Sequence, residues 1–225
     1  MKKLFALLSV AVVLCLSGCA TPIHMSPTKE TQVLDTSKDS ILLMSLTLKN
    51  SFHPSYQPSP IVVNVERGDA SQTADRLNFL FDPEGAEEGK LENHYLVRMS
   101  LPPGKYVVRG VMGQSGIFPA HGFFFAPLHE DIEVKPNSVV YLGHVDATVV
   151  ERKDGELRAG PVIPLIDQAV TGFSGGTWDV SISDNYEHDI TSFRTTFPVL
   201  DKASIDKDVL APWDKKKATD WWLAH

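Results

Sequence analysis

Ile41-Leu42-Leu43-Met44-Ser45-Leu46-Thr47-Leu48 is a nearly continuous apolar run in which large aliphatic side chains recur at every second position. Leu42, Met44, Leu46 and Leu48 would share one face of an extended strand, because successive side chains of a strand point to opposite sides. A period of two without a helical period indicates a β-strand with a buried face. The stretch therefore predicts a β protein from residue 41 onward.

Segments of similar character follow along the chain, separated by short turn-forming stretches. The further strand candidates are Ile61–Val65, Leu77–Phe81, Tyr95–Met99, Tyr106–Val111, Ile132–Val134, Val139–Val150, Val162–Ile166 and Thr177–Ser183. Pro102-Pro103-Gly104 predicts a hairpin between two of them, and Pro136-Asn137 and Asp154-Gly155 predict further turns. With short turns and no helical pattern between the strands, we expect a mainly β chain folded as an antiparallel β-sandwich of immunoglobulin-like or transthyretin-like type over residues 40–184.

The character changes after Ser183, where apolar residues recur at spacings of three and four. This stripe is formed by Ile190, Phe193, Phe197 and Leu200. It predicts a helix within Tyr186–Leu200, with Asp189 as a candidate cap near its start. Ile205–Leu210 suggests another short helical turn, and Pro212 can begin a last helix. Residues 185–225 are therefore expected to form a helical extension.

The N-terminus has the pattern of an export signal. Lys2 and Lys3 precede an apolar stretch from Leu4 to Leu16, which is too short to span a bilayer comfortably. The stretch ends in Leu16-Ser17-Gly18-Cys19, which resembles the lipobox of bacterial lipoproteins. The resemblance implies that residues 1–18 are a signal peptide, that cleavage precedes Cys19, and that its thiol receives lipid.

Two neighbouring residues refine this expectation. Cys15 is a poorer attachment site than Cys19, because the bulky Leu14 precedes it. Ala20 follows Cys19, and in Gram-negative lipoproteins an Asp at that position favours retention in the inner membrane. The resemblance therefore implies the outer membrane, with acyl chains such as palmitate as the membrane anchor. Residues 19–39, poor in large apolar groups, are expected to be a flexible tether.

A second resemblance concerns two short segments of the β region. Leu101-Pro102-Pro103-Gly104-Lys105-Tyr106 and the segment Val134–Tyr141 are similar to strand-opening segments of transthyretin-like and carboxypeptidase-regulatory-like modules. The resemblance covers about forty residues of the chain. It implies a β-sandwich, and it defines no activity.

Charge and cysteine content exclude several classes of function. The chain has a formal charge of −7, and loss of Lys2 and Lys3 with the signal would take it to −7 − 2 = −9. This balance argues against nucleic acid as a partner, since nucleic-acid binding requires a basic surface. After cleavage only Cys19 would remain, and lipid would occupy its thiol. A disulfide, a cysteine metal site and a cysteine nucleophile are therefore not expected.

The histidines of the β region are scattered, without a recognised metal-binding spacing. Sheet geometry could bring His121, His129 and His144 together, with Glu130 or Asp146 completing a metal site. The alternative, which the spacing favours, is that these histidines are independent surface or half-buried residues. The first interpretation would allow a metal-dependent hydrolase.

The segment from Ile117 to Pro127 is unusually aromatic. It contains Phe118, Phe123, Phe124 and Phe125. Three consecutive phenylalanines cannot all face one side of a strand. One interpretation places Phe123 and Phe125 in the core and Phe124 beneath the C-terminal helices. The other makes the segment a binding edge for a hydrophobic ligand, a peptide or the acyl region of a membrane.

No sequence motif indicates catalysis. Gly172-Phe173-Ser174-Gly175-Gly176 lacks the Gly-x-Ser-x-Gly spacing of a nucleophile elbow. We therefore expect a non-enzymatic binding, assembly or accessory module of the cell envelope, without a cofactor. Its expected partners are the lipid bilayer, through acylated Cys19, and an envelope protein. A hydrophobic-ligand carrier or sensor using residues 117–127 is the alternative, and a metal-dependent hydrolase a further one.

Overall fold

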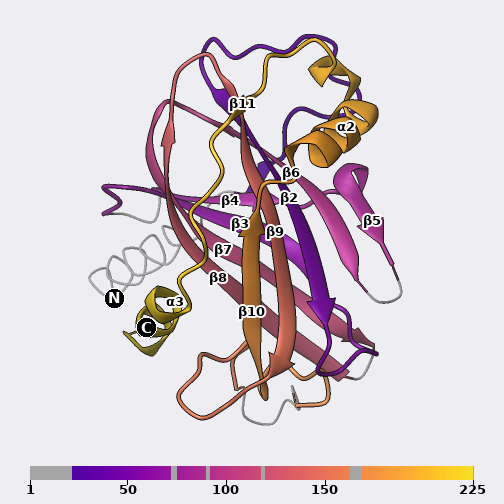
Figure 1. Ribbon diagram of the computed structural model, residues 1–225, viewed down its shortest axis with the longest axis vertical. Helices are drawn as coiled ribbons and strands as arrows, with labels where there is room; N and C mark the ends of the chain where they lie inside the picture. Colours follow the sequence, from indigo (N-terminus) through magenta and orange to yellow (C-terminus); the bar gives the residue numbers. More distant parts are fainter. Residues whose placement is uncertain (1–21, 72–74, 90–91, 118–119, 163–168, 225) are drawn as a thin grey trace, which may run out of the picture.

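The chain folds as two β-sheets packed face to face, with a helix on the outer side of one sheet (Figure 1). The computed structural model describes residues 22–71, 75–89, 92–117, 120–162 and 169–224. Within these residues no helix is long and apolar enough to cross a membrane. The mainly β sandwich expected from the sequence is confirmed.

The first sheet, sheet A, has five strands in the order β1-β4-β3-β7-β8. Their bounds are β1 Pro22–His24, β4 Arg76–Leu80, β3 Ser59–Arg67, β7 Gly104–Ile117 and β8 Ala120–Val134. β1 pairs with β4 in parallel, and the other neighbours are antiparallel. β8 extends well beyond the expected Ile132–Val134, because it continues through the aromatic segment.

The second sheet, sheet B, has the order β10-β9-β2-β6-β5, and a short β11 also pairs with β9. Their bounds are β10 Gly176–Ser183, β9 Val139–Glu151, β2 Ser40–Asn50, β6 Asn93–Leu101, β5 Ala86–Glu88 and β11 Asp206–Lys207. β2 and β9 are parallel neighbours, so this sheet is mixed and not wholly antiparallel. The helix expected over Ile205–Leu210 is replaced by β11, and most of Val162–Ile166 lies outside the described residues.

Two apolar cores lie on the two sides of sheet B. The larger core lies between the sheets and contains Leu42, Met44, Leu46 and Leu48, the face that the alternation predicts. The smaller core lies on the outer side of sheet B, between β2 and β9 and the helix α2 (Tyr186–Thr196) with the short helix η3 (Pro198–Leu200). Its members include Ile41, Leu43, Tyr141, Ile190, Phe193, Phe197 and Leu200. Sheet B is therefore covered on both faces along part of its length.

The predicted hairpin at Pro102-Pro103-Gly104 is wrong. The strand before it, β6, belongs to sheet B, and the strand after it, β7, belongs to sheet A. The turn is as short as expected, and the Tyr106 hydroxyl donates a hydrogen bond of 2.9 Å to the Pro102 carbonyl. The prolines end the pairing of β6, and the chain crosses from one layer to the other.

The segment expected to be a flexible tether, residues 19–39, is packed against the sandwich from Pro22 onward. β1 extends sheet A, and Met25 is buried in the main core. Ser26 N donates to the carbonyl of Arg98, and the Arg98 side chain donates back to the Pro27 carbonyl at 2.7 Å. These contacts with distant parts of the chain hold the polar segment from Pro22 onward on the sandwich. The composition of the segment gives no sign of them.

Arg98 lies on the outer face of β6 and is fully buried. Its guanidinium donates to Asp82, to the Leu96 carbonyl at 2.8 Å and to Pro27, and it lies 4.0 Å from the centroid of the Phe197 ring. Burial lowers the pKa of Arg98, and the neighbouring Asp82 opposes this effect. The side chain joins β6, the N-terminal segment, the loop before β5 and the end of α2.

We expect Arg98→Ala to lower the free energy of unfolding by about 3 kcal/mol, in the lower part of the range for removing one partner of a buried ion pair. The lower part applies because the Asp82 side chain stays 25% exposed to water. Urea denaturation measures the change. Arg76→Ala is the control, because the Arg76 side chain is 61% exposed, and its effect should stay within about 0.5 kcal/mol. Equal effects of the two substitutions would contradict a central role for Arg98.

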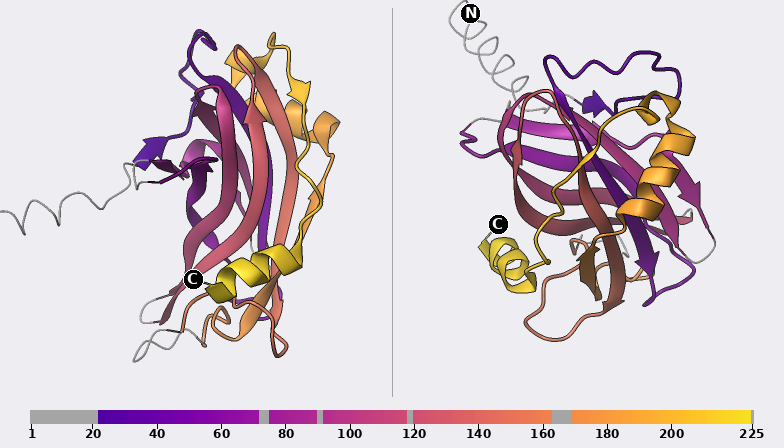
Figure 2. Two further views of the ribbon diagram at one scale, coloured as in Figure 1. Left: turned by 90° about the vertical axis from the view of Figure 1, so that its left-hand side faces the viewer. Right: turned by 45° about the horizontal axis from the view of Figure 1, so that its top comes forward.

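The C-terminal helix α3 (Lys215–Ala224) lies against sheet A, on the other side of the molecule from α2 (Figure 2). Ala218 is buried, and Trp213 Nε1 donates to the Pro127 carbonyl of β8 at 2.8 Å. The expected helical extension therefore divides into two parts that cover different sheets. Asp189, a candidate cap, lies inside α2 and is buried, and Asn185 occupies the cap position.

Candidate functional site

The three histidines considered as metal ligands are not brought together. His121 and His129 lie on β8 of sheet A, whereas His144 lies on β9 of sheet B. His121 is exposed, and the buried His129 ring lies 4.5 Å from that of Trp221. Among the described residues, no group of three potential ligands could hold a metal ion. The hypothesis of a metal site at these histidines is therefore wrong.

The consecutive phenylalanines point in the opposite sense to the interpretation that places Phe123 and Phe125 in the core. Phe124 is 1% exposed in the main core, with ring centroids 5.3 Å from Phe173 and 5.5 Å from Trp178. Phe123 is 43% exposed on the outer face of sheet A. Phe125 shares that face, 5.8 Å from the Trp221 ring. The register of β8 decides this, since Ala126 and other inward residues continue the same alternation as Phe124.

Two of the predicted residues, Phe118 and Cys19, lie outside the described residues. Cys19 precedes the first residue of β1, Pro22, by three positions. The predicted attachment point is therefore close along the chain to the edge of sheet A.

A groove of about 900 Å³ lies on the outer face of sheet B, beside α2. β2, β6 and β9 form its floor, and α2, β5 and the loop before β5 form its walls. Its titratable and hydroxyl-bearing residues are Lys29, Ser45, Thr47, Glu84, Glu87, Glu92, His94, Tyr95, His144, Asp146, His188, Asp189, Thr191, Ser192, Thr195 and Thr196. The groove is thus lined by many polar and titratable side chains.

A chain of hydrogen bonds runs along the floor of the groove. His144 Nδ1 lies 2.8 Å from Ser45 Oγ, and its Nε2 lies 3.2 Å from Thr47 Oγ1. Thr47 also lies 2.9 Å from His94 Nδ1. At the other end, Ser45 donates to the carboxylate of Asp189. Five side chains from three strands and α2 are therefore linked.

Asp189 is held from three sides. Besides Ser45, it accepts a hydrogen bond of 2.6 Å from the Tyr141 hydroxyl and lies 3.1 Å from His188 Nδ1. Burial, together with the Asp189 carboxylate, raises the pKa of Tyr141 well above its usual range. The Tyr141 hydroxyl therefore keeps its proton and acts as a fixed donor.

The order of these groups differs from that of a nucleophilic triad. In a triad the imidazole lies between the hydroxyl and the carboxylate, so that it can remove the hydroxyl proton. Here Ser45 lies between His144 and Asp189, and its proton is directed to the carboxylate. Ser45 Oγ is then left to accept from His144 Nδ1–H. The arrangement orients the polar groups of the floor and lacks the hydroxyl–imidazole–carboxylate order of a triad.

The electrostatic character of the groove is acidic. Five carboxylates line it, from Glu84, Glu87, Glu92, Asp146 and Asp189, whereas Lys29 is its one lysine among the described residues. Carboxylates gathered in a concave surface focus a negative potential and attract cationic groups. The groove therefore favours a positively charged partner.

Sequence reasoning missed this site, although β2 carries a signal for it. The outward positions of β2 change from Ile41 and Leu43 to Ser45 and Thr47, while the inward positions stay apolar. The change marks the point where the apolar cover by α2 ends and the groove opens. His94 and Asp189, which complete the floor, come from segments distant in sequence and could not be connected to it from spacing.

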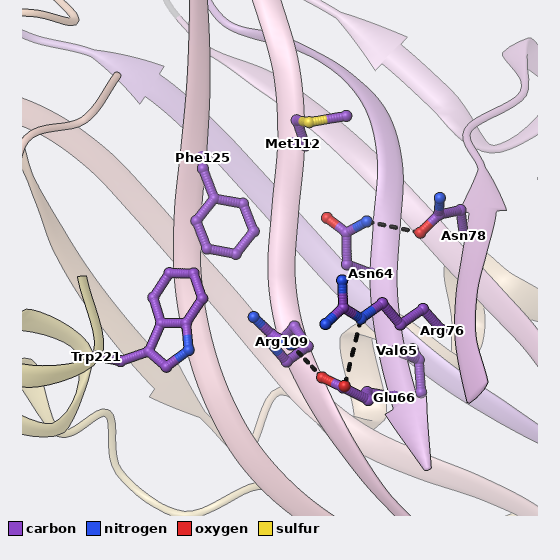
Figure 3. A pocket seen from close by; sticks show the side chains of 9 residues that line it. All are labelled: Asn64, Val65, Glu66, Arg76, Asn78, Arg109, Met112, Phe125 and Trp221. Atoms are coloured by element: carbon purple, nitrogen blue, oxygen red, sulfur yellow. Dashed lines mark hydrogen bonds and ion pairs between the residues drawn. The ribbon is translucent and has the colours of Figure 1, made fainter. Parts of the chain in front are cut away.

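A second, smaller pocket of about 230 Å³ lies on the outer face of sheet A (Figure 3). It is lined by Asn64, Val65, Glu66, Arg76, Asn78, Arg109, Met112, Phe125 and Trp221. Glu66 lies between the two guanidinium groups, in an ion pair with Arg109 and 3.5 Å from Arg76 Nε. Trp221 comes from α3, and the Arg109 guanidinium lies 4.8 Å from the centroid of its ring.

Protonation of His144 should destabilise the fold. Burial lowers the pKa of His144, although Asp189 and Asp146 oppose the shift while His94 and His188 add to it. The unfolded chain therefore binds a proton before the folded one does, so stability is complete above the usual pKa of 6.5 and falls as the pH drops through the lowered value. Urea titrations from pH 8 to pH 5 should show a shallower fall for His144→Gln.

The matched control for this experiment is His121→Gln, because His121 is exposed on sheet A and lies outside the groove. It should leave the pH dependence of unfolding as in the unaltered chain. If His144→Gln also leaves it unchanged, the groove histidine does not contribute.

Comparison with known proteins adds no relative. No protein-family description, no curated protein and no solved structure matches this chain.

Proposed function

We propose that this chain is an exported lipoprotein, held at the outer membrane through acylated Cys19, whose β-sandwich is a non-enzymatic binding module. The groove on sheet B is its binding site, and a basic segment of another envelope protein is its partner. The observation that carries the proposal is the acidic, histidine-containing groove, in which the polar side chains of the floor are fixed by one another and lack the order of a nucleophilic triad.

The anchor rests on the sequence. Leu16-Ser17-Gly18-Cys19 follows an apolar stretch of export-signal length, and no Asp follows the cysteine. Two or three acyl chains at one cysteine give stable attachment, whereas one chain gives only reversible binding. The similarity of Leu101–Tyr106 and Val134–Tyr141 to transthyretin-like modules remains a prediction of the family and adds nothing on activity.

The position of the groove suits a tethered binding module. β1, which begins three residues after Cys19, lies on the side of the molecule opposite to α2 (Figure 2). Anchoring on the β1 side would leave the groove beside α2 facing away from the bilayer. The groove is lined by five carboxylates and one lysine, so its attraction for a basic partner is electrostatic. We therefore expect the affinity for that partner to fall as the salt concentration is raised.

We expect Cys19→Ser to abolish incorporation of a clickable palmitate analogue and to release the protein from the membrane fraction. Cys15→Ser is the matched control, since Cys15 lies in the same apolar stretch but follows Leu14. It should leave both labelling and membrane retention intact. Lipid on the Cys19→Ser chain, or none on the unaltered chain, would contradict the anchor.

The binding site is tested with a photo-crosslinking amino acid placed at Glu87, an exposed residue of the groove. Glu151, exposed at the end of β9 and outside the groove, is the control position. In intact envelopes we expect a discrete adduct from position 87 alone, lost when Glu92→Lys reverses a neighbouring charge. Equal adducts at both positions, or an adduct that persists with Glu92→Lys, would argue against a charge-selective groove.

A further inference from the structure

We propose that the outer face of sheet A, at the pocket of Figure 3, lies on the bilayer and takes the anionic head group and upper acyl chain of a phospholipid. This inference rests on the proposed lipid anchor at Cys19. It assigns to the molecule a membrane-facing side, distinct from the groove beside α2.

Only a short length of chain separates the proposed anchor from the pocket. Pro22 pairs in register with Asn78, a residue that lines the pocket. Cys19 precedes Pro22 by three residues, and three extended residues reach at most about 11 Å. Acyl chains on Cys19 would therefore hold this edge of sheet A at the membrane surface.

The pocket is divided into an apolar half and a polar half. Met112, Phe125 and Trp221 form one half, and Arg76, Arg109 and Glu66 lie across from them (Figure 3). Met112 is 42% exposed, so the apolar half of the pocket is open at the surface of sheet A. A tryptophan next to cationic groups is typical of the boundary between head groups and acyl chains.

The polar half of the pocket offers hydrogen-bond donors to an anionic head group. Each guanidinium carries five N–H donors, and Glu66 takes up only some of those on Arg76 and Arg109. The buried Nε of Arg109 has no hydrogen-bond partner among the described residues. The two arginines and one carboxylate give the polar half a net charge of +1, which suits a phosphate in an otherwise acidic protein.

The size of the pocket agrees with partial insertion. Its 230 Å³ is below the range of about 300–1,000 Å³ for sites that enclose a whole ligand. The pocket would therefore hold the head-group region of a lipid that stays in the bilayer, and not extract the lipid.

The test uses the mature acylated chain in vesicles, with one thiol introduced for a fluorescent label. Met112→Cys places the label at the pocket, and Thr191→Cys places it on exposed α2 as the control. No other thiol interferes, because Cys15 leaves with the signal and Cys19 carries lipid. We expect vesicle binding to shield the Met112→Cys label from a water-soluble quencher and to leave the Thr191→Cys label accessible.

Lipid composition distinguishes the head group from free phosphate. Shielding should be stronger in vesicles of phosphatidylcholine with phosphatidylglycerol than in phosphatidylcholine alone, and inorganic phosphate should not compete. Arg76→Gln should remove the dependence on phosphatidylglycerol. This substitution is preferred to one at Arg109, because the exposed Arg76 contributes less to the ion pair with Glu66.

Two negative outcomes are distinguishable, because palmitate labelling is scored on the same sample. An acylated chain whose Met112→Cys label stays as accessible as the Thr191→Cys label overturns the membrane-facing assignment and leaves the anchor intact. A chain without acylation overturns the anchor and, with it, this inference. Shielding that phosphate abolishes would also overturn the assignment to a lipid.

Discussion

The burial of β2 on both of its faces is the constraint on which the rest of the structure depends. Its inward residues fill the space between the sheets, and its outward residues Ile41 and Leu43 need a second cover. Helix α2 and η3 supply that cover with Phe193 and Leu200. Leaving such a surface in water would forfeit about 25 cal/mol for each Å² of apolar area. The C-terminal segment is therefore an integral layer of the fold.

The same constraint creates the groove. Cover by α2 is needed only where the outward side chains of β2 are apolar, and beyond Leu43 they are hydroxyl-bearing. Both Ser45 and Thr47 then lie within hydrogen-bond distance of His144, and Ser45 also donates to Asp189 in the first turn of α2. Buried polar groups persist only when they are paired, so the linked side chains also explain why this floor is stable. β2 therefore packs against α2 through Ile41 and Leu43 and lines the groove with Ser45 and Thr47.

The molecule has two chemically different sides. The side with α2 carries the acidic groove, and the side with β1 carries the small pocket with Arg76 and Arg109. Arg98 connects Pro27 of the N-terminal segment to sheet B and to Phe197 after α2, so the described N-terminal segment is held on the domain. From Pro22 onward this segment is therefore part of the domain and not a flexible tether.

The sequence by itself determined where most strands lie, because a period of two in apolar residues reports which positions are buried whatever the partner strand is. It also determined the helix within Tyr186–Leu200 and the candidate lipid attachment at Cys19. Only the tertiary structure decided which strands pair: β6 and β7 separate into two sheets, Phe124 turns inward, and residues 22–39 pack on the sandwich. Pairing depends on contacts between residues far apart in the chain, and local periodicity carries no information about them. For the same reason the groove, assembled from Ser45, His144 and Asp189, became visible only in three dimensions.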